Sequence, residues 1–109
     1  MKKSIILFLF LLTSCASMMV KFTPYPGAPS NLAPTEKVEI LNTMPDKPYF
    51  QLGEIVSEGF SDQEVIDRIA KKAKEVGADA VVIIDRENRG KDLPGFRVWR
   101  AVAIKYQQK

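Results

Sequence analysis

Histidine is absent from this chain, and cysteine occurs only once, at position 15. A single cysteine cannot form a disulfide within the chain. Without histidine there is also no Cys/His zinc site and no base to activate a catalytic thiol. A strong charge of one sign is lacking as well, since 16 basic side chains face 13 acidic ones. No basic run interleaved with aromatic residues is present, so we expect no nucleic-acid partner.

A signal peptide is predicted over residues 1–14. Its parts are a short positive region, an apolar run and two small polar residues: Lys2 and Lys3, then Ile5 to Leu12, then Thr13 and Ser14. The apolar run of about eight residues is too short to cross a bilayer as a helix, which takes about 20. Cleavage after this segment lowers the basic side chains from 16 to 14, so the mature chain is nearly balanced in charge.

The segment Leu12-Thr13-Ser14-Cys15 resembles the lipobox of bacterial lipoproteins, in which an aliphatic and two small residues precede cysteine. The resemblance implies cleavage before Cys15, a diacylglycerol anchor on its thiol, and acylation of the new amine by a chain such as palmitate. Each buried methylene contributes about 0.8 kcal/mol, and two or more chains anchor stably. An ordinary secretory signal with an incidental cysteine is the alternative. Ala16 stands where aspartate would favour the inner membrane, so we expect the outer membrane, facing the periplasm.

Residues 15–36 are predicted to form a lipidated, proline-rich tether. Four prolines fall within eleven residues: Pro24, Pro26, Pro29 and Pro34. Proline fixes φ and removes a hydrogen-bond donor, which disfavours regular structure. Twenty semi-extended residues would hold the domain up to about 60 Å from the lipid. A disordered spacer is the favoured interpretation. The alternative places four apolar residues at the membrane interface or against the domain: Met18, Met19, Val20 and Phe22.

Residues 37–109 are predicted to form one small α+β periplasmic domain. We expect a four-stranded mixed sheet in β-β-α-β-β order, with one helix packed on one face. The strands are predicted by period-two alternation or by a short apolar run: Val38–Asn42, Tyr49–Val56, Ala80–Ile84 and Phe96–Tyr106. The first two strands should pair as a hairpin, with a possible bulge at Gly53. The third is continuously apolar, which indicates burial on both faces.

The helix is marked at both ends. Ser61 and Glu64 have the spacing of a capping box, and Gly77 is the expected C-terminal stop. Between them, apolar residues recur at helical spacing: Val65, Ile66, Ile69, Ala70, Ala73 and Val76. A strand, a helix and a further strand predict a right-handed crossover, which would set Ala80–Ile84 parallel to Tyr49–Val56.

The segment from Asp85 to Gly95 is predicted to be a charged loop between the last two strands. Loops often carry functional residues, so four of its charged residues are candidates for a site: Asp85, Arg86, Glu87 and Arg89. A solvated hairpin connection is the favoured interpretation.

Three further segments carry a family resemblance: Leu52-Gly53-Glu54-Ile55, the run from Ala73 to Val82, and Ala101-Val102-Ala103-Ile104-Lys105-Tyr106. Across residues 48–106 they resemble small bacterial envelope proteins that include the Rcs stress-sensing outer-membrane lipoprotein and the YbjQ-like proteins, once described as heavy-metal-binding. The resemblance implies the fold and an envelope role. The Rcs sensor's domain holds disulfides, which this chain cannot form. The residues of this chain also give no support to the description as heavy-metal-binding.

These patterns predict a membrane-anchored, non-enzymatic binding or signalling module that contacts an envelope protein and resembles a stress sensor. The alternative is a self-assembling structural lipoprotein that forms homo-oligomers. No triad, glycine-rich phosphate loop or convincing carboxylate pair points to an enzyme. We therefore expect no catalytic residues, no cofactor and no metal. Lipid attachment at Cys15 is the one site that the sequence assigns.

Overall fold

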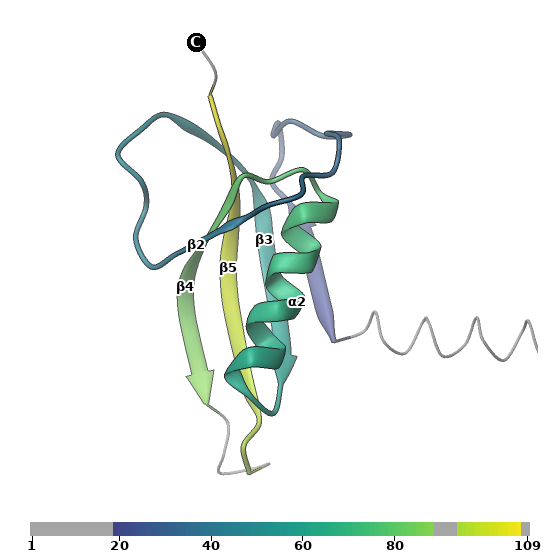
Figure 1. Ribbon diagram of the computed structural model, residues 1–109, viewed down its shortest axis with the longest axis vertical. Coiled ribbons are helices and arrows are strands. Elements are labelled where there is room, and N and C mark those ends of the chain that lie inside the picture. Colours follow the sequence, from purple (N-terminus) through teal and green to yellow (C-terminus); the bar gives the residue numbers. More distant parts are fainter. Residues whose placement is uncertain (1–18, 89–93, 108–109) are drawn as a thin grey trace, which may run out of the picture.

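The computed structural model describes residues 19–88 and 94–107, which form a five-stranded mixed sheet with one helix (Figure 1). The elements in chain order are β1 (Val20–Pro24), β2 (Glu39–Leu41), β3 (Tyr49–Gly59), α2 (Asp62–Glu75), β4 (Ala80–Asn88) and β5 (Arg97–Tyr106). The α+β class and the single helix on the sheet confirm the prediction. The predicted count of four strands is wrong, because β1 lies in the segment assigned to the tether. Among the described residues, no helix is long and apolar enough to cross a membrane.

Strand β1 corrects the prediction of a disordered tether. It pairs antiparallel with residues 53–57 of β3, and its Val20 and Phe22 pack against the main core. Pro24 ends the strand at the edge of the sheet, where its missing N–H removes no ladder bond. The prolines therefore limit the length of regular structure in this segment without preventing it from joining the sheet.

The chain between β1 and β2 also lies against the domain. The Tyr25 N–H donates to the Leu52 carbonyl at 3.1 Å, and the Thr35 N–H donates to the Lys74 carbonyl at 3.0 Å. Leu32 packs against the main core. Residues 19–36 are thus held by both β3 and the end of α2, and they do not act as a free spacer.

The strands lie in the order β1-β3-β5-β4-β2, with β5 in the centre. Strand β5 is antiparallel to both β3 and β4, so these two run parallel, as the crossover predicted, but β5 separates them. The predicted hairpin between the strands at 38–42 and 49–56 is wrong. Strand β2 instead pairs parallel with Ala80–Val82 at the opposite edge of the sheet. Alternating apolar residues identify a strand but do not specify which strand it pairs with.

Helix α2 begins and ends as predicted. The Ser61 hydroxyl accepts a hydrogen bond from the Glu64 N–H at 3.2 Å, and the Glu64 carboxylate accepts one from the Phe60 N–H at 3.1 Å. Gly77 adopts a φ of +82°, the left-handed conformation that ends many helices. Val65, Ile69 and Ala73 are buried against the sheet.

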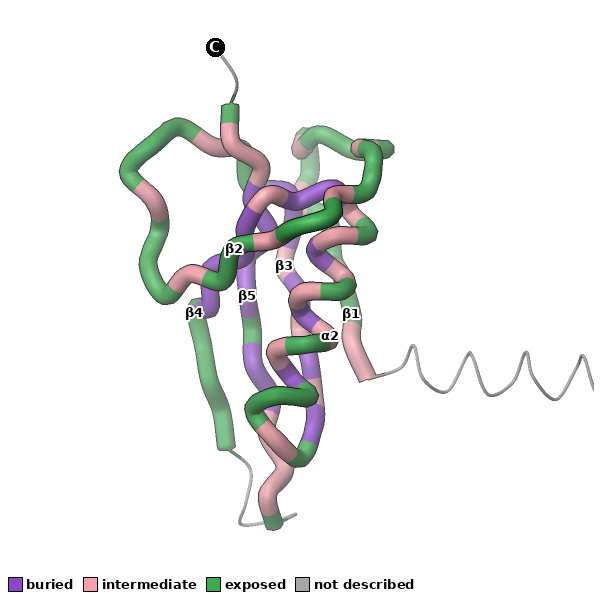
Figure 2. The backbone as a smooth tube through the Cα atoms, viewed as in Figure 1, coloured by how far each residue is buried: buried purple, intermediate pink, exposed green. Residues whose placement is uncertain are grey.

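Much of the sheet is buried (Figure 2), and buried apolar side chains form a cluster on each of its faces. The main core lies between α2 and the sheet, and a smaller cluster on the opposite face contains Ala80, Val82, Val102 and Ile104. Burial of Ala80–Ile83 confirms the prediction for this strand, whereas Ile84 is 49% exposed. Strand β4 then continues to Asn88 after a bulge between Ile83 and Asp85, so residues 85–88 are not the predicted loop.

Candidate functional site

The residues predicted as candidates do not gather into one site. Cys15, the signal peptide and Arg89 lie outside the described residues. The other three candidates, Asp85, Arg86 and Glu87, follow one another along the exposed half of β4. The Arg86 guanidinium lies 4.9 Å from the centre of the Trp99 ring and donates to the Asn42 side chain. Arg86 and Glu87 line one hollow beside Trp99, together with Asp62 and Arg97, whereas Asp85 does not line it.

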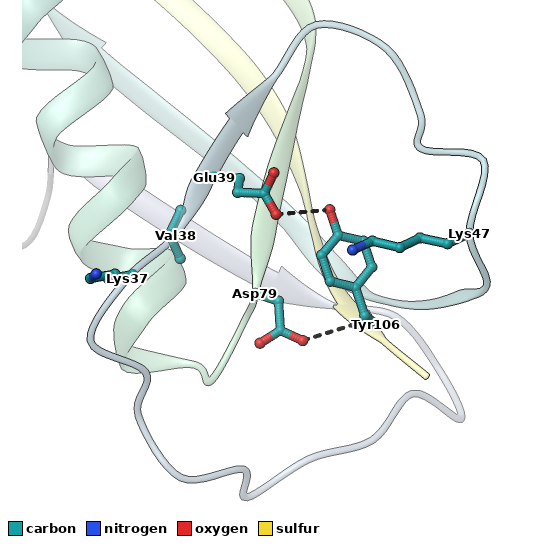
Figure 3. A pocket seen from close by; sticks show the side chains of 6 residues that line it. All are labelled: Lys37, Val38, Glu39, Lys47, Asp79 and Tyr106. Atoms are coloured by element: carbon teal, nitrogen blue, oxygen red, sulfur yellow. Dashed lines mark hydrogen bonds between the residues drawn. The ribbon is translucent and has the colours of Figure 1, made fainter. Parts of the chain in front are cut away.

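A groove lies where β2 and β4 begin and β5 ends (Figure 3). Its volume is about 580 Å³, and it is lined by Lys37, Val38, Glu39, Lys47, Asp79 and Tyr106. A hollow of about 500 Å³ adjoins it and shares Glu39, Lys47 and Tyr106. The two together form what we call the Tyr106 groove. Its second part is also lined by Leu41 and by residues 43–46 of the connection between β2 and β3.

Backbone pairing brings the lining residues together from distant parts of the chain. The Glu39 N–H donates to the Asp79 carbonyl at 3.1 Å, and the Asp79 N–H donates to the Ile104 carbonyl at 2.9 Å. These bonds align the first residues of β2 and β4 with the last residues of β5. The Asp79 carboxylate then accepts from the Tyr106 N–H at 3.0 Å and pairs with the Lys105 ammonium at 3.2 Å.

The phenol of Tyr106 lies at the centre of the groove. It donates a hydrogen bond to the Glu39 carboxylate at 3.2 Å, and the Lys47 ammonium lies 3.8 Å from the centre of its ring. Desolvation raises the pKa of this phenol above its ordinary value of 10.0, and the negative charges of Glu39 and Asp79 raise it further. The phenol therefore stays protonated at neutral pH and serves as a hydrogen-bond donor.

The carboxylates of the groove have partners within the domain, whereas two of its lysines have no carboxylate partner among the described residues. Its two carboxylates are engaged, Asp79 with Lys105 and Glu39 with the Tyr106 hydroxyl. Within the described part of the chain, no carboxylate forms an ion pair with Lys37 or Lys47. The described residues thus neutralise neither ammonium group with a carboxylate, although that of Lys47 lies over the Tyr106 ring, and an anionic group such as a carboxylate is suited to pair with either.

The described residues contain no group of three or more acidic, histidine or cysteine side chains that could hold a metal ion. The Tyr106 groove instead offers hydrogen bonds, two ammonium groups and an aromatic ring. This combination is suited to binding a polar, anionic surface group.

Sequence reasoning missed most of this groove. It gave no functional role to Asp79, Glu39, Lys47 or Tyr106. One signal was available, because a continuously apolar strand at 80–84 needs a neighbour on each side. An antiparallel pairing with the last strand would have placed Asp79 beside Tyr106.

Comparisons with family models, curated proteins and solved structures found no match to this chain. The resemblance to the Rcs and YbjQ-like envelope proteins therefore rests on the quoted residues alone.

Proposed function

We propose that the protein is a membrane-anchored bacterial lipoprotein whose domain is a non-enzymatic binding or signalling module of the cell envelope. The observation that carries the anchor is the segment Leu12-Thr13-Ser14-Cys15 after a short apolar run, with Cys15 as the only cysteine. In this proposal lipid on Cys15 holds the domain at the outer membrane, facing the periplasm. The resemblance to stress-sensing lipoproteins supports a signalling role.

The Tyr106 groove supports the binding part of the proposal. An envelope protein partner would place a carboxylate near Lys37 and Lys47 and accept or compete for the Tyr106 hydroxyl. Lys37 and Lys47 are both exposed, so each ion pair formed there contributes at most about 1 kcal/mol, and the Tyr106 hydroxyl adds a hydrogen bond to it. The partner is thus defined by an acidic side chain or a chain terminus that reaches into the groove.

The anchor is tested by the Cys15→Ala substitution. Wild-type protein should fractionate with membranes and carry the mass of the acyl groups, whereas the variant should lose both properties. A variant that stays in the membrane fraction as firmly as wild type would contradict the lipid anchor.

The partner is tested by crosslinking the lipidated protein in its own envelope, under resting and stressed conditions. The double substitution Lys37→Glu and Lys47→Glu should lower the yield of the crosslinked partner about tenfold, which corresponds to about 1.4 kcal/mol. The matched control reverses two exposed lysines outside the groove, Lys21 and Lys71. Equal loss in both variants, or no specific partner in wild type, argues against the groove as the binding site.

Self-assembly is the second candidate, and exposed apolar residues near one sheet edge favour it. Ile40 and Met44 are each 39% exposed and Ile84 is 49% exposed. Strand β2 covers only Ala80–Val82 of β4, and no described strand pairs with that side of β4 further along. Exposed strand edges are templates for pairing with another chain. Sedimentation of the domain decides this, because a strict monomer at high concentration excludes assembly through this edge.

A further inference from the structure

The chain enters the sheet very close to the proposed lipid. Met19 is four residues beyond Cys15, and its carbonyl accepts a hydrogen bond from the Glu58 N–H at 3.0 Å. Four residues span at most about 14 Å even when fully extended. With β1 docked on β3, this short segment replaces the tether of about 60 Å expected from proline content. The end of the domain beside Glu58 must therefore lie near the membrane surface.

That end of the domain carries an aromatic pair, of which one ring is exposed and the other half-buried. Phe60 follows Glu58 by two residues, in the turn between β3 and α2, and Phe96 immediately precedes β5. Their ring centres are 5.4 Å apart in an edge-to-face arrangement. Phe60 is 51% exposed, the largest fraction among the exposed large apolar residues described. Figure 1 places the turn between β3 and α2 and the beginning of β5 together at the lower end of the sheet.

We infer that Phe60 and Phe96 rest in the headgroup region of the bilayer that holds the lipid on Cys15. This inference rests on the proposed lipid anchor. Aromatic rings favour the interface between hydrocarbon and water, where their flat apolar surface leaves bulk water. Two partly exposed rings bind weakly by themselves. The anchored chain, however, holds them at a high effective concentration beside the membrane, so a weak contact becomes persistent.

The charges around the aromatic pair are compatible with a neutral membrane surface. Arg97 pairs with Asp62 at 2.7 Å, and Arg68 pairs with Glu64 at 3.4 Å. Of the described residues at this end, Arg97 and Arg68 thus have an acidic partner within the domain. The contact should therefore depend on the apolar rings, not on anionic lipid, and it should persist at high salt.

Docking in this way also orients the Tyr106 groove. Strand β5 runs from Arg97, beside the aromatic pair, to Tyr106. Its ten residues extend about 30 Å at about 3.3 Å per residue. The groove then opens on the side of the domain that faces away from the membrane, toward the periplasm.

The test uses the lipidated full chain in phosphatidylcholine vesicles. Since Cys15 carries lipid, an introduced cysteine is the only free thiol and takes an environment-sensitive fluorophore. Gln63→Cys places the label beside Phe60, and Asp46→Cys places it in the exposed connection near the Tyr106 groove. The label at 63 should shift to shorter wavelength and be quenched by headgroup spin labels, and the label at 46 should do neither.

Substitutions of the rings complete the experiment. The double variant Phe60→Ser and Phe96→Ser should abolish the shift at position 63, and its urea midpoint checks that it folds. Phe50→Ser is the matched control, because Phe50 is 45% exposed but lies near the other end of β3. It should leave the shift unchanged.

Three outcomes would overturn the inference. Equal responses from the labels at 63 and 46 exclude a docked aromatic end. If the fluorescence shift at position 63 vanishes when each vesicle holds one protein, the aromatic pair binds a second copy of this chain and not the bilayer. A mass without acyl groups at Cys15 overturns the proposed anchor and this inference together, whereas the first two outcomes leave the anchor intact.

Discussion

The carboxylate of Asp79 accepts a hydrogen bond from the backbone N–H of Tyr106 at 3.0 Å and joins the start of β4 to the end of β5. Its other oxygen pairs with Lys105 at 3.2 Å. Through this contact a residue in the turn after the helix fixes the last residue of the central strand. The position of the Tyr106 ring, and with it the hydrogen bond to Glu39, depends on this pairing.

Substitution of Asp79 by alanine should destabilise the domain. The Tyr106 N–H would lose its only acceptor, and Lys105 would lose its ion-pair partner. Loss of a charge-assisted hydrogen bond at a partly buried site costs about 1–3 kcal/mol. Urea unfolding followed by circular dichroism measures this cost. Asp79→Asn should cost less, since its amide oxygen can still accept from the N–H.

Asp46→Ala is the control for this substitution. Asp46 is exposed and has no ion pair within the described residues, so its replacement should change stability by less than about 0.5 kcal/mol. Equal costs for the two alanine variants would mean that the Asp79 contacts contribute nothing specific.

The Tyr106 phenol predicts a loss of stability at alkaline pH. Desolvation and the nearby carboxylates raise its pKa in the folded state above the value of 10.0 that an unfolded chain would show. This contribution is complete below about pH 10 and falls as the pH rises from that value through the folded-state pKa. Unfolding midpoints measured from pH 8 upward should show it.

Tyr106→Phe isolates this contribution, because it retains the ring and removes the titrating group. The difference in stability between wild type and variant should shrink above pH 10, while the titration of lysines affects both alike. A difference that stays constant with pH would contradict the raised pKa of Tyr106.

The helix and the strand character of the domain could be predicted because their signals are local. Ser61, Glu64 and Gly77 mark the helix ends through contacts within a few residues, and the structure confirms them. The bulge at Gly53 was also predicted from sequence, and a register shift between Gln51 and Gly53 confirms it. These features depend on backbone conformation and spacing, which the sequence displays directly.

The sheet order and the Tyr106 groove could not be derived in this way, because they depend on contacts between distant residues. Tyr106 and Glu39 are 67 residues apart and meet only when β5 takes the centre of the sheet. Strand β1 was missed for a different reason. Its short VKFTP segment has an alternating pattern, but the prolines that follow dominated the interpretation.

Gly53 should be intolerant of a side chain. A Cβ at this position would lie 2.5 Å from the Thr23 carbonyl oxygen and 2.7 Å from the Phe22 ring, both in β1. The Gly53→Ala variant must displace β1, with a cost of about 1–3 kcal/mol. Hydrogen exchange should show faster exchange of the β1 amides, and urea unfolding should show the lower stability.

Gly27→Ala separates this crowding from strain in the backbone. Gly27 has a φ of +78°, and a Cβ there would meet no atom within 4 Å. Its substitution should cost about 1–2 kcal/mol through the left-handed conformation alone and leave exchange in β1 unchanged. Unchanged exchange in β1 for Gly53→Ala as well would mean that β1 is not packed on Gly53.

A chain that begins at Glu36 should be less stable than one that begins at Met19. The shorter chain lacks Val20, Phe22 and Leu32, which pack against the main core, and it exposes the edge of β3. A fully buried apolar side chain contributes about 1.5–3 kcal/mol, so three partly buried ones give a loss of a few kcal/mol. Urea midpoints measure the loss, and sedimentation should reveal association through the exposed edge. In the longer chain, Phe22→Ala should lower the midpoint and Lys21→Ala, at an exposed neighbouring position, should not. Equal midpoints for the two chains would restore the free tether and remove the basis for placing the domain close to the membrane.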